Sequence, residues 1–474
     1  MALVTPKSLA SLIKIFAGVL SALPFLLFAP PSDAQSPAAE TPHKPCAVKP
    51  VEFDGWQAQQ LSNDYVTLTF VPQLGGRLMQ VVFAGHPYLF INPQFKGKYF
   101  PPPTDPKGTW YNYGGDKLWP MPEGDEDADH WPGPIADELD DGVYSFTNFG
   151  FSNKVCGVRM TSPHDPRTGL QYSREISIAV NSPEISFRAT MKNISDHPIQ
   201  WSMQSVSQYE LTDPQNPAAF NKNFWAFTPV NPDSAYFTSF QVRAGLADDP
   251  SFKVKDGLFS LHWLYLQNEV WLDSPAGWVA VLDRSSHFAM VERFPYHERA
   301  GYPGKATVIF YKNGPSFGSD KNGMPSIHTD ASGDPFYMEA ELNSPIVKLA
   351  PAESYEMDTT WFPTRTGDTF QTVAEAGVVE RPLALTAVNA GSHLVGTFGV
   401  FYDGSLSAIF YDRADKVLSR TDLGPVRVDE LAVVDYGVTI PQNSDRIELH
   451  LFTSGIDRGK LGEITLRSFA GGRP

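Results

Sequence analysis

Short runs of alternating apolar and polar residues recur along most of this chain, and turn-forming residues separate them. From Arg446 to Leu451 every second residue is apolar, as expected for a strand with one buried face. Gln171–Phe187 contains two such runs with a break at Pro183. Helical periodicity is scarce, and the best short helix is predicted at Thr369–Ala376. The pattern therefore predicts an all-β protein.

The length of 474 residues exceeds what one hydrophobic core usually supports, so more than one domain is expected. We place a boundary near Val378–Pro382, between a large β-domain at residues 51–376 and a small C-terminal β-sandwich domain at residues 383–474. Beyond the boundary, Asp403-Gly404 lies between two strand-like runs and is a strong hairpin signal. The alternative is that the C-terminal strands extend the large sandwich.

The first 34 residues have the pattern of a signal peptide. Lys7 and Lys14 precede the apolar run Ile15–Ala29, and small residues lead to a cleavage site near Ala34. The run is shorter than the ~20 apolar residues of a spanning helix, which makes an uncleaved anchor the weaker alternative. We expect a periplasmic or secreted protein with no membrane partner once the signal is removed.

Two cysteines, Cys46 and Cys156, make up the whole cysteine content. An even count in an exported chain favours one disulfide bond over two free thiols. Cys46 lies in a Pro-rich leader at residues 35–50, so this bond would tie the leader to the large domain. Two thiols without a CxxC or Cys/His spacing do not predict a zinc site.

The formal net charge is -16, and removal of the first 34 residues, which carry +1, leaves -17. Such acidity argues against nucleic acid or an anionic membrane as a partner and is compatible with a neutral sugar. Glu123–Asp141 holds nine acidic residues and no Lys or Arg. Its spacing resembles a calcium loop, but His130 and Ala136 stand where glycine and glutamate are needed. We predict no metal and no cofactor.

The stretch Trp110–Pro120 reads WYNYGGDKLWP and combines four aromatic residues, two glycines, an Asp and a Lys. Glycines let the backbone approach a ligand closely, rings offer apolar faces, and charged groups form hydrogen bonds. A sugar needs this mixture, because its C–H faces stack on rings and its hydroxyls need polar partners. The alternative is an aromatic loop that only packs against one end of a sandwich.

Upstream, Tyr65–Asn92 predicts three strands joined by turns at Gly75-Gly76 and Gly85-His86-Pro87. The VPQLGGR turn, the Asn92-Pro93 pair and the GGDKLWP block resemble an uncharacterised family within the galactose mutarotase-like superfamily, which includes the aldose 1-epimerases. The resemblance covers roughly Val51–Arg365 and implies a large antiparallel β-supersandwich. It also implies a sugar or glycan as the ligand.

In aldose epimerases a Glu removes the proton of the anomeric hydroxyl, and two His serve as acid and binder. Residues 336–339 resemble the strand that ends in this Glu, so the resemblance implies that Glu339 is the base, with Glu341 as its substitute. The alternative is two carboxylates facing solvent on an exposed strand. The family's histidines are not matched: Tyr113-Gly114-Gly115 replaces His-Gly-Gly, and residues 204–209 read QSVSQY. Catalysis therefore stays an open question.

The first hypothesis is an exported carbohydrate-binding protein. The second is an aldose 1-epimerase-like or other glycan-processing enzyme that uses Glu339, and the third is a non-catalytic structural or docking β-protein. Arg77 and Arg174 are candidates for holding hydroxyls or a carboxylate, because the guanidinium fork suits bidentate contacts. The expected sugar site comprises Trp110, Tyr113, Asp116, Lys117, Trp119, Arg77, Arg174, Glu339 and Glu341.

Overall fold

The structure is a computed structural model that describes residues 45–102, 111–122, 138–151, 154–319, 325–328, 335–388 and 391–466. The expected signal peptide and Trp110 lie outside these residues. The described part consists of antiparallel strands and one short 3₁₀ helix at Pro303–Lys305, without an α-helix. This confirms the all-β prediction. In the same residues, no helix has the length and hydrophobicity needed to cross a membrane.

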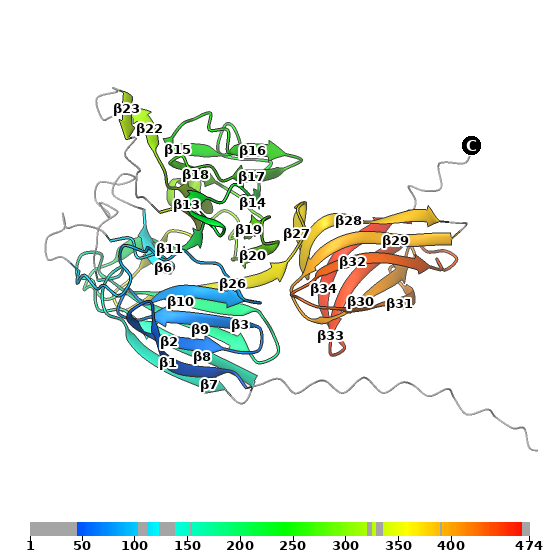
Figure 1. Cartoon of the computed structure of the whole chain (residues 1–474), viewed down its shortest axis with the longest axis horizontal. Coiled ribbons are helices and arrows are strands. Elements are labelled where there is room, and N and C mark those ends of the chain that lie inside the picture. The colour runs from blue at the N-terminus through cyan, green and yellow to red at the C-terminus, as the bar shows by residue number, and fades with distance from the viewer. Residues whose placement is uncertain are drawn as a thin grey trace, which may run out of the picture. The chain divides into compact units, whose positions relative to one another are not determined.

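The first sheet has twelve strands and runs through the large domain (Figure 1). Its strands, in spatial order, are β1 (Ala47–Phe53), β2 (Trp56–Ser62), β3 (Val66–Val71), β4 (Arg77–Phe83), β6 (Asp116–Met121), β11 (Ile199–Glu210), β24 (Tyr337–Asn343), β21 (Val308–Lys312), β18 (Asn268–Leu272) and β15 (Gln241–Gly245), while β5 (His86–Pro87) pairs with β4 and β25 (Val347–Leu349) with β11.

The second sheet has ten strands and forms the other layer. In spatial order they are β16 (Phe252–Lys255), β17 (Leu258–His262), β14 (Phe224–Pro229), β19 (Trp278–Asp283), β20 (Phe288–Arg293), β26 (Ser354–Arg365), β10 (Ile185–Asn193), β9 (Leu170–Ala179), β8 (Val155–Thr161) and β7 (Ser145–Phe151). Two separate hairpins join β12 (Thr212–Asp213) to β13 (Asn216–Phe220) and β22 (Ser316–Ser319) to β23 (Pro325–His328).

The main hydrophobic core takes its side chains from strands of both sheets. Strand β9 shows how the sequence builds it, because every second residue is buried from Leu170 to Ile178. Successive side chains of a strand point to opposite faces, so this alternation turns one face of β9 towards the core. The same alternation places Arg174 on the buried face.

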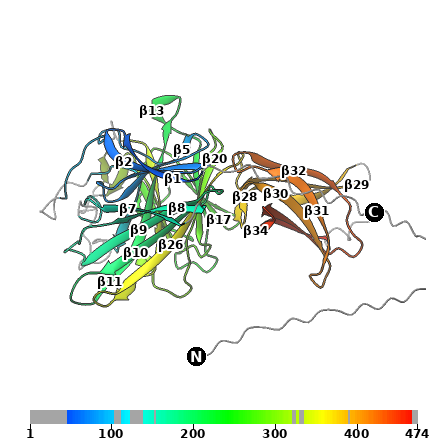
Figure 2. The same ribbon diagram turned by 90° about the horizontal axis from the view of Figure 1, so that it is seen from below.

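Two four-stranded sheets form the C-terminal part, coloured yellow to red in Figure 2. One contains β27 (Thr372–Ala374), β28 (Gly377–Val388), β29 (Gly391–Val400) and β32 (Leu431–Val438), and the other contains β31 (Val417–Val426), β30 (Gly404–Tyr411), β33 (Arg446–Thr453) and β34 (Ile456–Thr465). They enclose a hydrophobic cluster of their own. The helix predicted at Thr369–Ala376 is wrong, because β27 pairs with β28 there. Residues 378–382, near which the sequence predicts a domain boundary, belong to β28.

The C-terminal part contacts the large sandwich through side chains. The ring of Phe362 stacks on that of Phe401 with centroids 4.5 Å apart. The Tyr65 hydroxyl donates a hydrogen bond to Asp403 at 3.0 Å. A buried cluster that includes Phe362 and Phe401 spans the expected boundary.

A disulfide bond joins Cys46 to Cys156, as the sequence predicted, with the two Cα atoms 6.0 Å apart. Cys46 immediately precedes β1 at the edge of the first sheet, while Cys156 lies in β8 of the second sheet. The bond therefore links the start of the described chain to the opposite layer.

Glu292 is a fully buried carboxyl group of the core. It accepts hydrogen bonds from the Ser207 hydroxyl, at 2.7 Å, and from the Tyr209 hydroxyl. Its Oε2 atom has no hydrogen-bond partner within the described residues. Burial raises the pKa of Glu292 from 4.5 to about 8, because a charged carboxylate is poorly solvated there. Glu292 thus holds a proton near neutral pH.

We predict that replacing both cysteines with serine destabilises the protein by about 4 kcal/mol, because the bond closes a long loop in the unfolded chain. The sequence separation of the two cysteines is 110 residues. Denaturant unfolding of the wild type and of the double Cys→Ser variant measures the difference. Equal midpoints and slopes would contradict the prediction.

That the large domain and the C-terminal part fold independently of each other stays a prediction. We expect residues 51–376 expressed alone to fold with a β-type circular dichroism spectrum. Their melting temperature should be lower than that of the full mature chain, because the fragment lacks both the Cys46–Cys156 bond and the contact of Phe362 with Phe401. The full mature chain is the control. An insoluble fragment beside a soluble full chain would show that the two parts fold as one unit.

Glu292 should make stability depend on pH. The folded state keeps a proton that the unfolded chain releases above pH 4.5, so the free energy of unfolding falls between pH 4.5 and about 8. The loss amounts to as much as about 1.4 kcal/mol per pH unit. Denaturant unfolding across this window should show a smaller loss in Glu292→Gln, which mimics the protonated group. Identical slopes for both proteins would refute this assignment.

Candidate functional site

Three neighbouring strands of the first sheet bring polar side chains to one face. Residues directly opposite each other in an antiparallel pair point to the same face. Val206 of β11 lies opposite both Lys117 of β6 and Glu341 of β24. Two residues along, Gln208 lies opposite Glu339. We call this surface the polar face and define it by the residues Arg77, Lys117, Gln204, Gln208, Glu339 and Glu341.

Hydrogen bonds between strands fix the two glutamates of the polar face. The Gln204 amide donates to Glu341 Oε2 at 2.6 Å, and the Gln208 amide donates to Glu339 Oε1. Glu339 and Glu341 also interact by a hydrogen bond between their side chains. One of the two carboxyl groups must therefore carry a proton when they share this bond.

Glu339 is the more accessible of the two glutamates. Its side chain is partly exposed, whereas that of Glu341 is 8% exposed. Burial raises the pKa of Glu339, and the nearby Lys117 ammonium group opposes this rise. A carboxyl group with a raised pKa that solvent still reaches can both accept and release a proton.

Arg77 and Lys117 reach the polar face from β4 and β6 and share one partner, Asp140. The Arg77 guanidinium binds Asp140 Oδ1 at 2.7 Å, and Lys117 Nζ lies 3.2 Å from the same oxygen. Lys117 Nζ also lies 3.8 Å from the centre of the Trp119 ring. All three charged side chains are at most 5% exposed. The two cations are thus held in place.

The turn at Gly75-Gly76 allows the segment around Asp140 to approach. The Gly75 amide donates to the Gly142 carbonyl at 3.0 Å, and a Cβ atom on Gly75 would lie 1.8 Å from the Asp140 carbonyl oxygen. Gly75 also has a positive φ of 62°. Next to Asp140, burial raises the pKa of Asp141 to about 8, and the Asp140 carboxylate adds to this rise. The glycine turn therefore places two carboxyl groups beside the polar face.

The structure places Asp116 and Arg174 on the opposite face of the sheet. Asp116 precedes Lys117 in β6, so its side chain points into the core between the two sheets. There it forms an ion pair with Arg174, whose guanidinium also donates to the Asp116 carbonyl at 3.1 Å. The two side chains are 0% and 4% exposed. Asp116 and Lys117 therefore do not converge on a common ligand.

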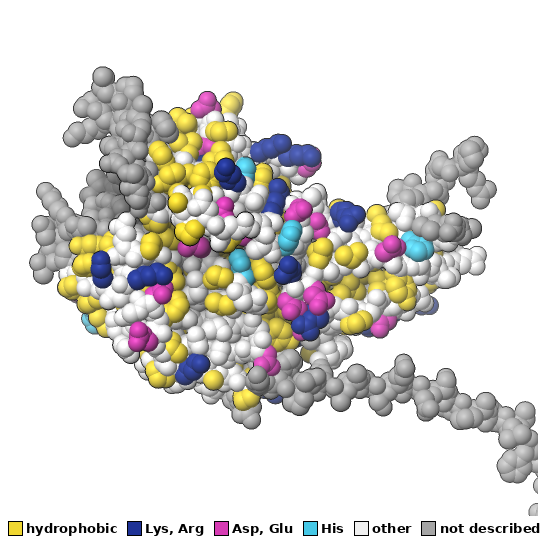
Figure 3. All heavy atoms as spheres, in the orientation of Figure 1, with side chains coloured by type: hydrophobic (Ala, Val, Ile, Leu, Met, Phe, Trp, Pro, Cys, Tyr) yellow, Lys and Arg dark blue, Asp and Glu magenta, His cyan; other side chains and the backbone are white. Residues whose placement is uncertain are grey.

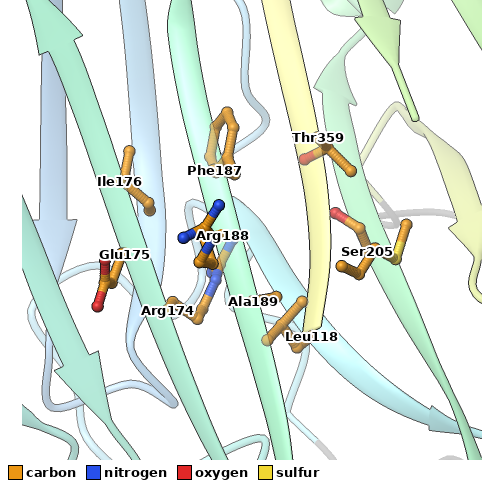
Figure 4. Close-up of a pocket in the computed structure, with 10 residues that line it drawn as sticks. Leu118, Arg174, Glu175, Ile176, Phe187, Arg188, Ala189, Ser205 and Thr359 are labelled. Atoms are coloured by element: carbon orange, nitrogen blue, oxygen red, sulfur yellow. The ribbon is translucent and has the colours of Figure 1, made fainter. Parts of the chain in front are cut away.

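A cavity of about 10 Å³ lies beside Arg174 (Figure 4). Leu118 and Ser205 of the first sheet line it together with Phe187 and Ala189 of the second. The volume corresponds to about one water molecule and excludes a sugar. Arg174 is thus part of the core packing and not of an open site.

Two aromatic residues of the WYNYGGDKLWP stretch, Tyr113 and Trp119, are packed inside the protein, while Tyr111 is half-buried and stacks on Phe100. Tyr113 is fully buried in a small cluster with Trp56 and Met79, and its hydroxyl accepts a hydrogen bond from the Phe100 amide at 2.9 Å. Burial raises the pKa of Tyr113, which makes it a poor proton donor. Trp119 is 3% exposed and packs against Lys117. Neither ring offers a free face to a ligand.

Sequence reasoning missed Gln204, Gln208 and Asp140 as members of the site. Gln204 and Gln208 occur in QSVSQY, the segment in which the resemblance led us to look for a histidine. The available signal was their spacing of four, which places both amides on one face of a strand. Asp140 gave no such signal, because the acidic segment 123–141 offers nine equivalent residues.

Comparison with known proteins found no matching family model and no match among curated proteins. Solved structures similar to this chain include a TPR-domain containing protein from Parabacteroides distasonis, at 13% identity and a TM-score of 0.44 over 67% of this chain. The match spans about half of that protein, 48% of its length.

Two further similar structures carry mutarotase descriptions. One is a putative mutarotase from Salmonella typhimurium, at 12% identity and a TM-score of 0.40, with 67% of this chain and 94% of that protein covered. The other is a galactose mutarotase-like protein from Lactobacillus casei, at 9% identity and a TM-score of 0.41, with 67% and 100% covered. Galactose mutarotase-like proteins are thus among the structures that this chain is similar to, as the sequence resemblance predicted.

Proposed function

We propose that this protein is an exported carbohydrate-binding protein and that its sugar site lies on the polar face. The observation that carries the proposal is the convergence of Lys117, Gln204, Gln208, Glu339 and Glu341 from three adjacent strands. Export is supported by the signal-peptide pattern and by the Cys46–Cys156 bond, since disulfides persist in oxidising compartments.

The side chains of the polar face suit the hydroxyl groups of a sugar. Carboxylates accept hydrogen bonds, an ammonium group donates them, and an amide does both. Gln204 and Gln208 hold the two glutamates in defined positions, which reduces the entropy lost when a ligand binds. Convergent polar groups with fixed geometry are typical of small-molecule sites.

The charge balance of the polar face favours a neutral sugar over an anionic one. Arg77 and Lys117 share the single negative charge of Asp140, and the Glu339–Glu341 pair, which holds one proton, balances the positive charge that remains. Glu339 and Glu341 would repel a ligand carboxylate, and the net charge of -16 adds to this repulsion. We therefore assign a neutral aldose or a glycan of neutral sugars as the ligand.

A second candidate function is anomer exchange, in which Glu339 serves as the base. The observation in its favour is that Glu339 is partly exposed while burial raises its pKa, as expected for a carboxyl group that accepts a proton from a ligand. The acid of the reaction is not assigned, because none of the six residues that define the polar face is a histidine. Binding without turnover is therefore the first candidate.

We predict that Lys117→Met weakens sugar binding about tenfold, because it removes a charged donor but keeps the volume of the side chain. Glu339→Gln should preserve affinity within about twofold, since its amide retains an acceptor oxygen. Glu356→Gln is the matched control, because Glu356 is 59% exposed on β26 of the other sheet. Calorimetric titration with D-glucose, D-galactose and neutral oligosaccharides measures affinity, and thermal unfolding checks folding.

NMR of anomer exchange separates the two candidate functions. If the wild type accelerates exchange and Glu339→Gln abolishes it, the protein is an enzyme and the preference for a pure binder is wrong. If none of these sugars binds and none is turned over, both sugar functions lose their support.

A further inference from the structure

A sugar site needs an apolar surface as well as polar groups, because the C–H faces of a pyranose stack on aromatic rings. Tyr113 and Trp119 do not supply this surface, since they are 0% and 3% exposed. The strand next to Glu339 carries another ring, because Tyr311 of β21 lies directly opposite Glu339 of β24. Tyr311 thus occupies the position beside the more accessible glutamate of the polar face.

The packing of β21 shows that Tyr311 points to the same side of the sheet as Glu339. Phe310, its neighbour in the strand, is fully buried, and its ring stacks on Phe259 of the second sheet with centroids 6.1 Å apart. Successive side chains of a strand point to opposite faces, so Tyr311 points away from the second sheet. It is half-buried there. Residues directly opposite each other share a face, which places Tyr311 beside Glu339 at a strand spacing of about 4.8 Å.

A second carboxyl group lies on the other side of Tyr311. Glu269 of β18 is directly opposite Tyr311 and is also half-buried. It accepts a hydrogen bond from the Trp271 indole, which holds the carboxyl group in place. Partly exposed side chains thus follow one another on three adjacent strands, with the ring between two carboxyl groups. This order suits the hydroxyl rim of a pyranose, whereas an apolar ligand would remove the carboxyl groups from water at a cost.

Neighbouring side chains hold the ring of Tyr311 in position. Its hydroxyl accepts a hydrogen bond from the Gln267 amide at 3.3 Å, and its ring centre lies 6.1 Å from that of Tyr337. The ring of Tyr337 in turn stacks on that of Phe90, with centroids 4.9 Å apart. A ring that is already positioned loses little entropy when a ligand binds.

Other exposed hydrophobic side chains gather over the region of β15 and β18, as Figure 3 shows. Phe237, in the loop before β15, is the most exposed large hydrophobic residue of the described chain. The row of paired residues that runs from β15 to Glu341 passes through Trp271 and Ile309, which are 2% and 1% exposed. This row is covered and does not connect Phe237 to the polar face, whereas Tyr311 adjoins the polar face directly.

We propose that Tyr311 is the stacking residue of the sugar site, so that a pyranose lies with one C–H face on its ring and its hydroxyl groups reach Glu339 on one side and Glu269 on the other. The inference rests on the proposed function of the polar face. It also narrows the ligand class to the six-membered ring form of a sugar. An open-chain alditol has the same hydroxyl groups but lacks the flat C–H face that stacks on a ring.

Calorimetric titration of the full mature chain with D-glucose, D-galactose and neutral oligosaccharides, with D-glucitol and galactitol as open-chain references, tests the proposal. The wild type should bind the pyranose about tenfold more tightly than its alditol. Tyr311→Phe keeps the ring and should bind within about twofold of the wild type. Tyr311→Leu keeps an apolar side chain without a ring and should lose about fivefold or more in pyranose affinity. Tyr355→Leu, at a half-buried position of β26 in the second sheet, is the matched control.

NMR of the bound sugar supplies a second measurement that a merely structural role of Tyr311 would not produce. The ring current of a stacked tyrosine shifts the C–H protons of the sugar upfield. We expect this shift with the wild type and with Tyr311→Phe, and its absence with Tyr311→Leu. Thermal unfolding checks that each variant is folded.

A folded Tyr311→Leu variant with unchanged affinities would overturn the inference, and the proposed function would stand if Lys117→Met still weakens binding. Equal losses in Tyr311→Phe and Tyr311→Leu would assign the effect to the hydroxyl group and also overturn stacking. If Tyr311→Leu does not fold, the absence of an upfield shift with the wild type and Tyr311→Phe overturns the inference, and its presence supports it. Absence of binding by any of these sugars would reject both proposals.

Discussion

The constraint on which the site depends is the two-residue period of strand β6. Asp116 and Lys117 are neighbours in sequence, so their side chains must point to opposite faces of the first sheet. Asp116 turns into the core and forms an ion pair with Arg174 of the second sheet. Lys117 turns to the other face and meets Asp140 and Trp119. One strand thus supplies both an internal link between the layers and a charged group of the candidate site.

Charge pairing offsets the cost of burying charged side chains, both in the core between the sheets and on the polar face. Removing Asp116 alone would leave the buried Arg174 uncompensated, which typically costs about 3–5 kcal/mol. On the polar face a single carboxylate, Asp140, pairs with both Arg77 and Lys117 and neutralises one of their two charges. The two glutamates next to them share a hydrogen bond and hold one proton between them, so the pair keeps a single negative charge. The polar face therefore carries little unbalanced charge, which agrees with a neutral ligand.

The positions of strands were predictable from the sequence where one face of a strand is buried and the other face is exposed to solvent. In β9 the alternation from Leu170 to Ile178 appears in the sequence and again in the burial of the side chains. The prediction was wrong at Thr369–Ala376, because pairing of β27 with β28 outweighs a short helical pattern. Arg174 could have been assigned to the core, since it occupies an apolar position of the β9 alternation.

The sequence by itself determined the β class and the pairing of Cys46 with Cys156, because strand period and cysteine count are local or countable features. Only the tertiary structure decided which face of β6 turns towards the second sheet and that Gln208 reaches Glu339. It also decided that Asp140, and not Asp116, binds Lys117. The Gln208–Glu339 contact joins strands that are 131 residues apart in the chain, and the Lys117–Asp140 contact joins a strand to a turn. A period of two gives two faces but does not say which one the other sheet will cover.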